Sequence, residues 1–322
     1  MSRYSLRRAL AAAAMCASAV LLTACGSSST ESALNPTRLI AFGDAFADVG
    51  QRGGAKYTVN IADDTPDVWL EQVASRYGQS LKPLSTGGLG YGQASARITA
   101  KPDAAGDATT LTVTEQIDEF LATHTPAEGD LVFVAGGIGD LITGGKAFLD
   151  GTLTQNDFVA QAEQAGRDLA AQTRRLVNAG SKHVVVVGPY DLALTPWGGL
   201  AGDKSGGLRE ASRRFNDVFK VAVVDMGNTV LYVDAAYYFT RLAEEPGDFN
   251  MDNSRDPVCT SVDAGPGIGL GAGQVNSALC TPSTVLAGKD YNKYMYADAI
   301  YAAPYAQRQF GDYAYDRIRN RW

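Results

Sequence analysis

The chain has 322 residues, of which 45% are hydrophobic and 20% charged. This composition is typical of a folded globular protein with one substantial core and excludes a largely disordered chain. The formal net charge is −7. Because nucleic-acid binding depends on phosphate neutralisation by lysine and arginine, this acidic balance argues against a nucleic-acid partner.

Residues 1–24 have the pattern of a secretory signal peptide. Three arginines precede an apolar run over residues 9–22, which is too short and too one-sided in charge for a spanning helix. The run ends in Leu-Thr-Ala-Cys-Gly, which resembles the bacterial lipobox. That resemblance implies a lipid anchor on Cys25, and Gly26 is usual there in outer-membrane lipoproteins. We therefore expect a cell-envelope protein that is held to the membrane by lipid. The alternative is a plain signal peptide that ends at a cysteine.

The remaining chain is expected to form a tether and a single domain. Residues 25–37 are mainly small and polar and are typical of a flexible tether. No linker divides residues 38–322, in which strands and helices alternate. The first expected helix has Thr65 as its cap and Pro66 in its first turn. Strands are expected at 38–42, 130–137, 183–188 and 229–234, and helices at 65–78, 112–124, 154–180, 208–227 and 303–320.

This order predicts an α/β fold, a three-layer α/β/α sandwich with a mostly parallel sheet. The four consecutive valines at 184–187 are the continuous apolar run typical of a parallel strand covered on both faces. Sites in such folds lie at the carboxyl ends of the strands.

Two cysteines are expected to form a disulfide. Cys259 and Cys280 are the pair left in an oxidising compartment once Cys16 leaves with the signal peptide and Cys25 takes lipid. The Gly-rich segment between them has no periodic pattern, and closing it would contribute about 3 kcal/mol. A metal site on the two thiolates would lack its further ligands.

Five stretches resemble the sequence blocks of the SGNH, or GDSL, hydrolase family, in the family's order. They are AFGDAFADVG (41–50), GLGYGQASA (88–96), VAGGIGDLI (134–142), VVVVGPYDLALTP (184–196) and YADAIYAAPYAQRQ (296–309). The resemblance implies a flavodoxin-like sandwich of the SGNH-hydrolase type and a site for ester hydrolysis.

The family's catalytic groups are missing from these blocks. The family uses a serine nucleophile, a histidine base with an aspartate three residues before it, and an oxyanion hole completed by a glycine N–H and an asparagine amide. On this chain the serine corresponds to Ala45, the asparagine to Gly139 and the histidine to Tyr301, while Gly92 and Asp298 remain. We call these five residues the family positions; because three of them are substituted, no intact catalytic set is present.

No other side chain offers a clear replacement base. The chain has two histidines, His124 and His183, and both precede strands, so they are expected at the sheet edge opposite the site. Tyr301 titrates near pH 10 when unperturbed and is a poor base at neutral pH. The sequence also gives no reason to expect a cofactor or a metal, since it has no dense acidic loop.

The leading hypothesis is therefore a catalytically silent, lipid-anchored relative with a retained cleft for an acyl-ester or glycan ligand. Its candidate binding residues are Asp44, Gly92, Asp140 and Tyr301. The motivation is that the blocks persist as structure while the chemical groups are gone.

Two alternatives remain. An active hydrolase could use the carboxylates of Asp44, Asp48, Asp140 and Asp298 as acid and base, although Asp44 and Asp140 are typical caps of a turn and of the next helix. A carbohydrate or cell-envelope binding module could stack sugars on tyrosines, although such clusters are commonly half-buried packing. The seven candidate rings are at positions 291, 294, 296, 301, 305, 313 and 315.

Overall fold

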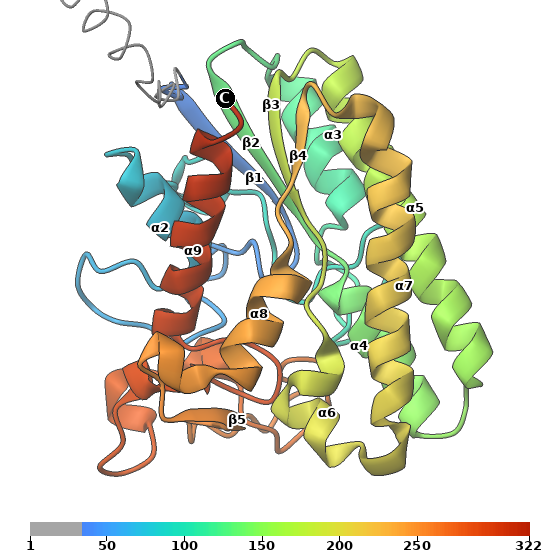
Figure 1. Ribbon diagram of the computed structural model, residues 1–322, viewed down its shortest axis with the longest axis vertical. Coiled ribbons are helices and arrows are strands. Elements are labelled where there is room, and N and C mark those ends of the chain that lie inside the picture. Colours follow the sequence, from blue (N-terminus) through green and yellow to red (C-terminus); the bar gives the residue numbers. More distant parts are fainter. Residues whose placement is uncertain (1–33) are drawn as a thin grey trace, which may run out of the picture. The chain divides into compact units, whose positions relative to one another are not determined.

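A computed structural model describes residues 34–322 and shows a parallel sheet between two layers of helices (Figure 1). The strands are β1 (Arg38–Gly43), β2 (Asp130–Ala135), β3 (His183–Val187) and β4 (Val230–Tyr232), paired in the order β1-β2-β3-β4. All three pairings are parallel. The expected three-layer α/β sandwich is confirmed. The proposed signal peptide and Cys25 lie outside the described residues.

One further segment extends the sheet beyond β1. The Ala41 N–H donates to the Leu89 carbonyl at 3.0 Å, and the Tyr91 N–H donates to the Ala41 carbonyl at 2.7 Å. The second family block therefore runs alongside the first, at the carboxyl half of β1.

The helices cover both faces of the sheet. On one side lie α2 (Trp69–Arg76), α8 (Ala235–Glu244) and α9 (Pro304–Arg319), and on the other α3 (Val113–Thr123), α5 (Gln155–Asn178) and α7 (Ser205–Val223) (Figure 1). Helix α4 (Ile138–Leu149) follows β2 and the short α6 (Pro196–Leu200) follows β3. No helix among residues 34–322 is both long and apolar enough to cross a membrane.

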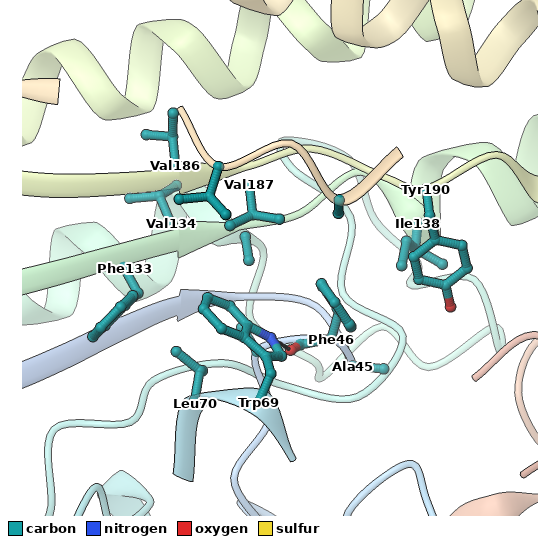
Figure 2. Packing of buried hydrophobic residues seen from close by; sticks show 14 of the residues in the cluster. Ala45, Phe46, Trp69, Leu70, Phe133, Val134, Ile138, Val186, Val187 and Tyr190 are labelled. Atoms are coloured by element: carbon teal, nitrogen blue, oxygen red, sulfur yellow. Dashed lines mark hydrogen bonds between the residues drawn. The ribbon is translucent and has the colours of Figure 1, made fainter. Parts of the chain in front are cut away.

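An aromatic cluster joins the first block to the α2 and α9 layer. Phe46 packs on Trp69 with ring centroids 5.7 Å apart, and the Trp69 Nε1–H donates to the Phe46 carbonyl at 2.7 Å (Figure 2). Phe310 of α9 lies 5.6 Å from Phe46 and 5.2 Å from Trp69. Burying such large rings is a main source of stability, so the turn after β1 is part of the core.

Helix α2 begins later than expected. The sequence predicts a start at Thr65, but the helix begins at Trp69. The Glu71 carboxylate accepts from the Asp67 and Val68 N–H groups at 2.9 and 3.3 Å, and Lys56 holds the Asp67 carboxylate at 2.7 Å. These contacts fix the residues after Pro66 as a loop, so the expected cap at Thr65 is wrong.

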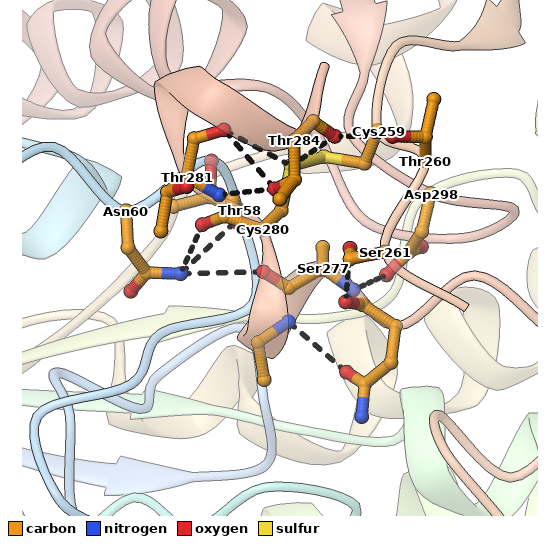
Figure 3. Close-up of a disulfide and its surroundings, with 12 residues drawn as sticks. Thr58, Asn60, Cys259, Thr260, Ser261, Ser277, Cys280, Thr281, Thr284 and Asp298 are labelled. Atoms are coloured by element: carbon orange, nitrogen blue, oxygen red, sulfur yellow. Dashed lines mark hydrogen bonds between the residues drawn. A yellow bond between two sulfur atoms is a disulfide. The ribbon is translucent and has the colours of Figure 1, made fainter. Parts of the chain in front are cut away.

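The segment 251–303 lies at the carboxyl end of the sheet, at the bottom of Figure 1. It contains the small parallel sheet of β5 (Asn253–Pro257) and β6 (Tyr294–Tyr296). Cys259 and Cys280 form the expected disulfide, with 5.9 Å between their Cα atoms (Figure 3). The chain between these cysteines is thereby held over the edge where the family site is expected.

Candidate functional site

The turn that follows β1 is fixed by backbone contacts. At Gly43 φ is +150°, and a Cβ there would lie 1.7 Å from the Ala135 carbonyl oxygen, so only glycine fits. Gln116 of α3 accepts from the Gly43 N–H at 2.8 Å and donates to its carbonyl at 2.9 Å. This clamp places Ala45 at the carboxyl end of the first strand.

Asp44 caps two backbone segments at once. Its Oδ1 accepts from the Phe46 N–H at 3.0 Å, which is the turn cap expected from the sequence. Its Oδ2 accepts from the Ile138 N–H at 2.8 Å, so it also caps the first turn of α4. Burial raises the pKa of Asp44 to about 7, against the opposing effect of these hydrogen bonds.

Asp140 does not cap the next helix, so that expectation is wrong. Gly137 occupies the N-cap of α4 with φ of +113°, and Asp140 lies in the first turn. The Asp140 carboxylate instead accepts from Arg97 Nε at 3.2 Å and from the Ile98 N–H at 2.9 Å. Asp44 reaches the start of α4 from the neighbouring strand, which makes a local cap unnecessary.

Asp298 likewise serves the backbone. It accepts from the N–H groups of Ile300 at 2.8 Å, Tyr301 at 2.7 Å and Ser277 at 3.1 Å. Burial raises its pKa. The contact to Ser277 ties the disulfide-closed segment to the last family block.

Asp48, the fourth carboxylate, accepts from the N–H groups of Gly50, Gln51 and Ala94 at 2.9, 2.7 and 2.8 Å. Asp44, Asp48 and Asp298 are thus each hydrogen-bonded to two or more backbone N–H groups, whereas Asp140 accepts from Arg97 and from one N–H. The first three are arranged as caps, in contrast to an acid and base that share a reacting proton.

The three substituted family positions are closed to solvent. Ala45 is 3% exposed and Tyr301 1% exposed, and Gly139 is also buried. A Cβ on Gly139 would lie 2.2 Å from the Ala96 carbonyl oxygen. An asparagine therefore has no room at Gly139 without movement of backbone. The open cleft expected at these residues is not present.

Gly92 and Tyr301 complete this closed arrangement. A Cβ on Gly92 would lie 2.4 Å from the Ala47 carbonyl oxygen. The Tyr301 ring packs 5.2 Å from the Tyr57 ring, and its hydroxyl has no hydrogen-bond partner within residues 34–322. Burial, with the nearby Asp44, raises the pKa of Tyr301 well above its usual range. Tyr301 is therefore neutral and no base.

Loop segments from distant parts of the chain meet around the disulfide, next to Asp298 (Figure 3). Asn60 Nδ2 donates to the carbonyls of Ser277 at 3.2 Å and Cys280 at 3.1 Å. Thr58 Oγ1 donates to the Ala302 carbonyl at 2.9 Å. The segment around Thr58 is thereby joined to both the disulfide and the last family block.

Both histidines lie away from the family positions, as expected. His183 begins β3 and its ring meets Trp322 at 5.0 Å. His124 follows α3, stacks on Phe120 at 5.3 Å and bonds to the Thr123 hydroxyl at 2.8 Å. Neither imidazole replaces the missing base.

The tyrosine cluster does not form an open groove. Tyr294, Tyr296, Tyr301 and Tyr315 are buried, and the other three rings are partly buried. Tyr313 stacks on Tyr238 with centroids 4.6 Å apart. The rings serve mainly as packing, so the expected stacking surface for sugars is not found there.

A separate cavity of about 360 Å³ lies beside the family positions. We call it the side cavity. Its lining includes Arg52, Tyr57, Ser95, Asp103, Asp263 and Asn276, but none of the five family positions. The Tyr57 ring stands between it and Tyr301. The sequence did not bring these residues together because they come from three loops that are far apart in the chain, and only Ser95 lies in one of the recognised blocks, near its end.

Within the described chain, no group of three or more histidine, cysteine, aspartate or glutamate side chains is placed to hold a metal ion. The side cavity therefore offers hydrogen-bonding groups and a ring rather than a metal-ligand set.

Comparison with known proteins finds similarity only among solved structures. No family model and no curated protein matches the chain. One similar structure is a member of the lipolytic protein G-D-S-L family from Veillonella parvula, with 11% identity and a TM-score of 0.41 over 86% of this chain and 94% of that one. Another is a carbohydrate acetylesterase from Sinorhizobium meliloti, with 15% identity and a TM-score of 0.44 over 87% of this chain and 97% of that one. These similarities concern the fold and say nothing about which chemical groups are retained.

Proposed function

We propose that this chain is a catalytically silent protein of the SGNH-hydrolase type that acts in the bacterial cell envelope as a binding protein. The observation that carries the proposal is the closure of the family positions. Ala45 and Tyr301 are buried where a nucleophile and a base would need to reach a substrate. The backbone packed against Gly139 leaves no room for the third group.

The remaining polar groups support the same conclusion. Asp44 and Asp298 are retained, but their oxygens accept from backbone N–H groups. Loss of nucleophile and base together leaves little of the family's rate enhancement, since the residual oxyanion hole and binding provide only a small part of it.

We place the protein at the membrane through lipid on Cys25, with the outer membrane as the proposed location. The lipobox-like stretch at residues 22–26 supports this proposal. Metabolic labelling with a fatty-acid analogue tests it: the full chain should take up label, and a Cys25→Ser variant should not.

An esterase assay tests the silent state. We expect the full-length chain, purified in a sugar-free detergent, to hydrolyse p-nitrophenyl acetate no faster than buffer with detergent. Activity that a single substitution in the chain abolishes would overturn the proposal and favour an active hydrolase.

A revertant distinguishes two causes of inactivity, the absence of the catalytic side chains and the burial of their positions. The double variant Ala45→Ser with Tyr301→His restores two family groups without adding a side chain at Gly139. Because both positions are buried, we expect this variant to remain inactive. Ester hydrolysis by the double variant would show that the region opens in solution and that the closed arrangement is not the barrier.

A further inference from the structure

The side cavity has polar walls built from three loops that are far apart in sequence. Arg52 Nη2 donates to Asp107 Oδ2 at 2.8 Å and to Thr110 Oγ1 at 2.6 Å. Its Nε and Nη1 groups have no protein acceptor within the described part of the chain. Asp103 Oδ2 accepts from Thr110 Oγ1 at 2.6 Å, which anchors the same wall.

The disulfide-closed segment supplies the opposite wall. Asp263 Oδ1 accepts from the Gly265 N–H at 2.8 Å, and its Oδ2 accepts from Asn276 Nδ2 at 2.8 Å. Because Cys259 and Cys280 flank this segment, the disulfide limits its freedom to move away from the cavity. The cavity is therefore held in shape before any ligand arrives.

Ser95 gives an independent sign of a ligand. It lines the side cavity and is 1% exposed, and its hydroxyl has no hydrogen-bond partner in residues 34–322. A buried hydroxyl without a partner costs about 1–3 kcal/mol. A polar ligand in the cavity would recover that cost by bonding to the Ser95 hydroxyl.

The charges of the cavity restrict the chemistry of the ligand. Three carboxylates, Asp103, Asp107 and Asp263, and one guanidinium, Arg52, line the cavity. Hydrogen bonds from Thr109 lower the pKa of Asp107 to about 2, so this carboxylate is ionised at neutral pH. An anionic ligand would meet net repulsion, and a long acyl chain would meet ionised and polar groups.

A neutral polyhydroxyl compound fits these walls. Its hydroxyls can donate to carboxylates and accept from Arg52 and Ser95, and its apolar ring face can lie against the Tyr57 ring. The volume of about 360 Å³ falls within the range of small-molecule sites, roughly 300–1,000 Å³.

We propose that the side cavity binds a neutral sugar of one or two units, with Ser95, Arg52 and Tyr57 as contact residues. This inference rests on the proposed binding function, but it concerns residues outside the family positions.

Calorimetry on the full-length chain in a sugar-free detergent tests the proposal. The probes are N,N′-diacetylchitobiose, cellobiose and maltose, each at up to about 10 mM, with octanoate and glucose 6-phosphate as acyl and anionic comparisons. We expect at least one neutral sugar to bind and both comparisons to fail. Binding of octanoate or glucose 6-phosphate in preference to all sugars would overturn the proposal, as would the absence of any sugar binding.

Two variants locate the binding. Ser95→Ala removes the unpartnered hydroxyl and should weaken sugar binding by about 3- to 10-fold, the value of one hydrogen bond. Arg52→Gln should weaken it as well. The matched control is Ser181→Ala, because Ser181 is also 1% exposed with an unpartnered hydroxyl but does not line the cavity. Equal affinity of the Ser95 and Ser181 variants would place the sugar elsewhere and overturn the assignment.

The assays test the two proposals separately. Sugar binding without ester hydrolysis supports both proposals, and the absence of both activities refutes the sugar site but not the proposal of catalytic silence. Hydrolysis of the aryl ester, together with sugar binding that depends on Ser95, refutes catalytic silence but supports the sugar site.

Discussion

The family positions and the side cavity are neighbours that differ in solvent exposure: Asp298 is 0% exposed, whereas the side chains of Arg52 and Asp107 are 52% and 35% exposed. The carboxylate of Asp298, one of the family positions, and that of Asp44, next to Ala45, are hydrogen-bonded to backbone N–H groups. In the side cavity, Ser95 keeps an unpartnered hydroxyl next to ionised carboxylates and a guanidinium. The two regions thus combine closed, backbone-packed positions with a neighbouring polar cavity, and the Tyr57 ring contacts both.

The largest expected effect tests how tightly the family positions are closed. Gly139 and Gly206 are each the second residue of a helix, α4 and α7 respectively. A Cβ on Gly139 would meet the Ala96 carbonyl oxygen at 2.2 Å, whereas a Cβ on Gly206 would meet nothing within 4 Å. Gly139→Ala should lower the free energy of unfolding by about 3 kcal/mol. Gly206→Ala should leave it equal or raise it by about 0.5–1 kcal/mol.

Urea denaturation of both glycine variants measures this contrast. Similar urea midpoints for the two variants would mean that the backbone around Gly139 can move to accept a methyl group. The family positions would then be less tightly packed than the structure indicates.

A second, smaller effect concerns the proton on Asp44. Its pKa in the folded protein is about 7, above the ordinary value of 3.8. Between these values the folded protein holds a proton that the unfolded chain does not, so stability present at low pH is lost as the pH rises. We expect the free energy of unfolding to fall by about 2 kcal/mol from pH 5 to pH 7 through this group.

Asp44→Asn is the control for this pH dependence. The substitution removes the titrating group, so the stability of the variant should vary less between pH 5 and pH 7 than that of the parent. Some pH dependence should remain, because the pKa values of Asp48, Asp140 and Asp298 are also raised. Denaturation midpoints at the two pH values test the prediction. A parent protein that becomes more stable toward pH 7 would contradict it.

The smallest expected effect compares two buried tyrosines. The Tyr190 hydroxyl donates to the Ile300 carbonyl at 2.8 Å, whereas the Tyr301 hydroxyl has no partner in the described structure. Tyr190→Phe should cost about 1 kcal/mol, and Tyr301→Phe should be neutral or slightly stabilising. Thermal unfolding resolves the difference. A clear loss of stability in Tyr301→Phe would mean that its hydroxyl has a bonding role, and the contrast with Tyr190 would fail.

Local patterns in the sequence were sufficient for the main elements of the fold. The valine run at 184–187 and the apolar positions of the long helix correspond to β3 and α5. The start of α2 was misplaced because Glu71 and Lys56, through contacts across the loop, outweighed the capping signal at Thr65. Helix α8 was not foreseen, although Asp234 at its N-cap accepts from the Tyr237 N–H and was a usable signal.

For the candidate site, too, the sequence revealed some features and the tertiary structure revealed others. The sequence by itself determined that Ala45, Gly139 and Tyr301 occupy their places in the blocks that resemble the family's. It also determined the cysteine pair. Covalent identity and short-range periodicity are properties of the chain alone, and folding does not change them.

Only the tertiary structure decided what became of the space around these groups. Whether Gly139 can take a side chain depends on the Ala96 carbonyl, and whether Ser95 finds a partner depends on loops that arrive from far along the chain. Burial, cavity shape and hydrogen-bond satisfaction arise from contacts between distant segments, and no local pattern encodes them. For that reason the residues at the family positions can be read from the sequence, while their burial and the neighbouring cavity appear only in the folded protein.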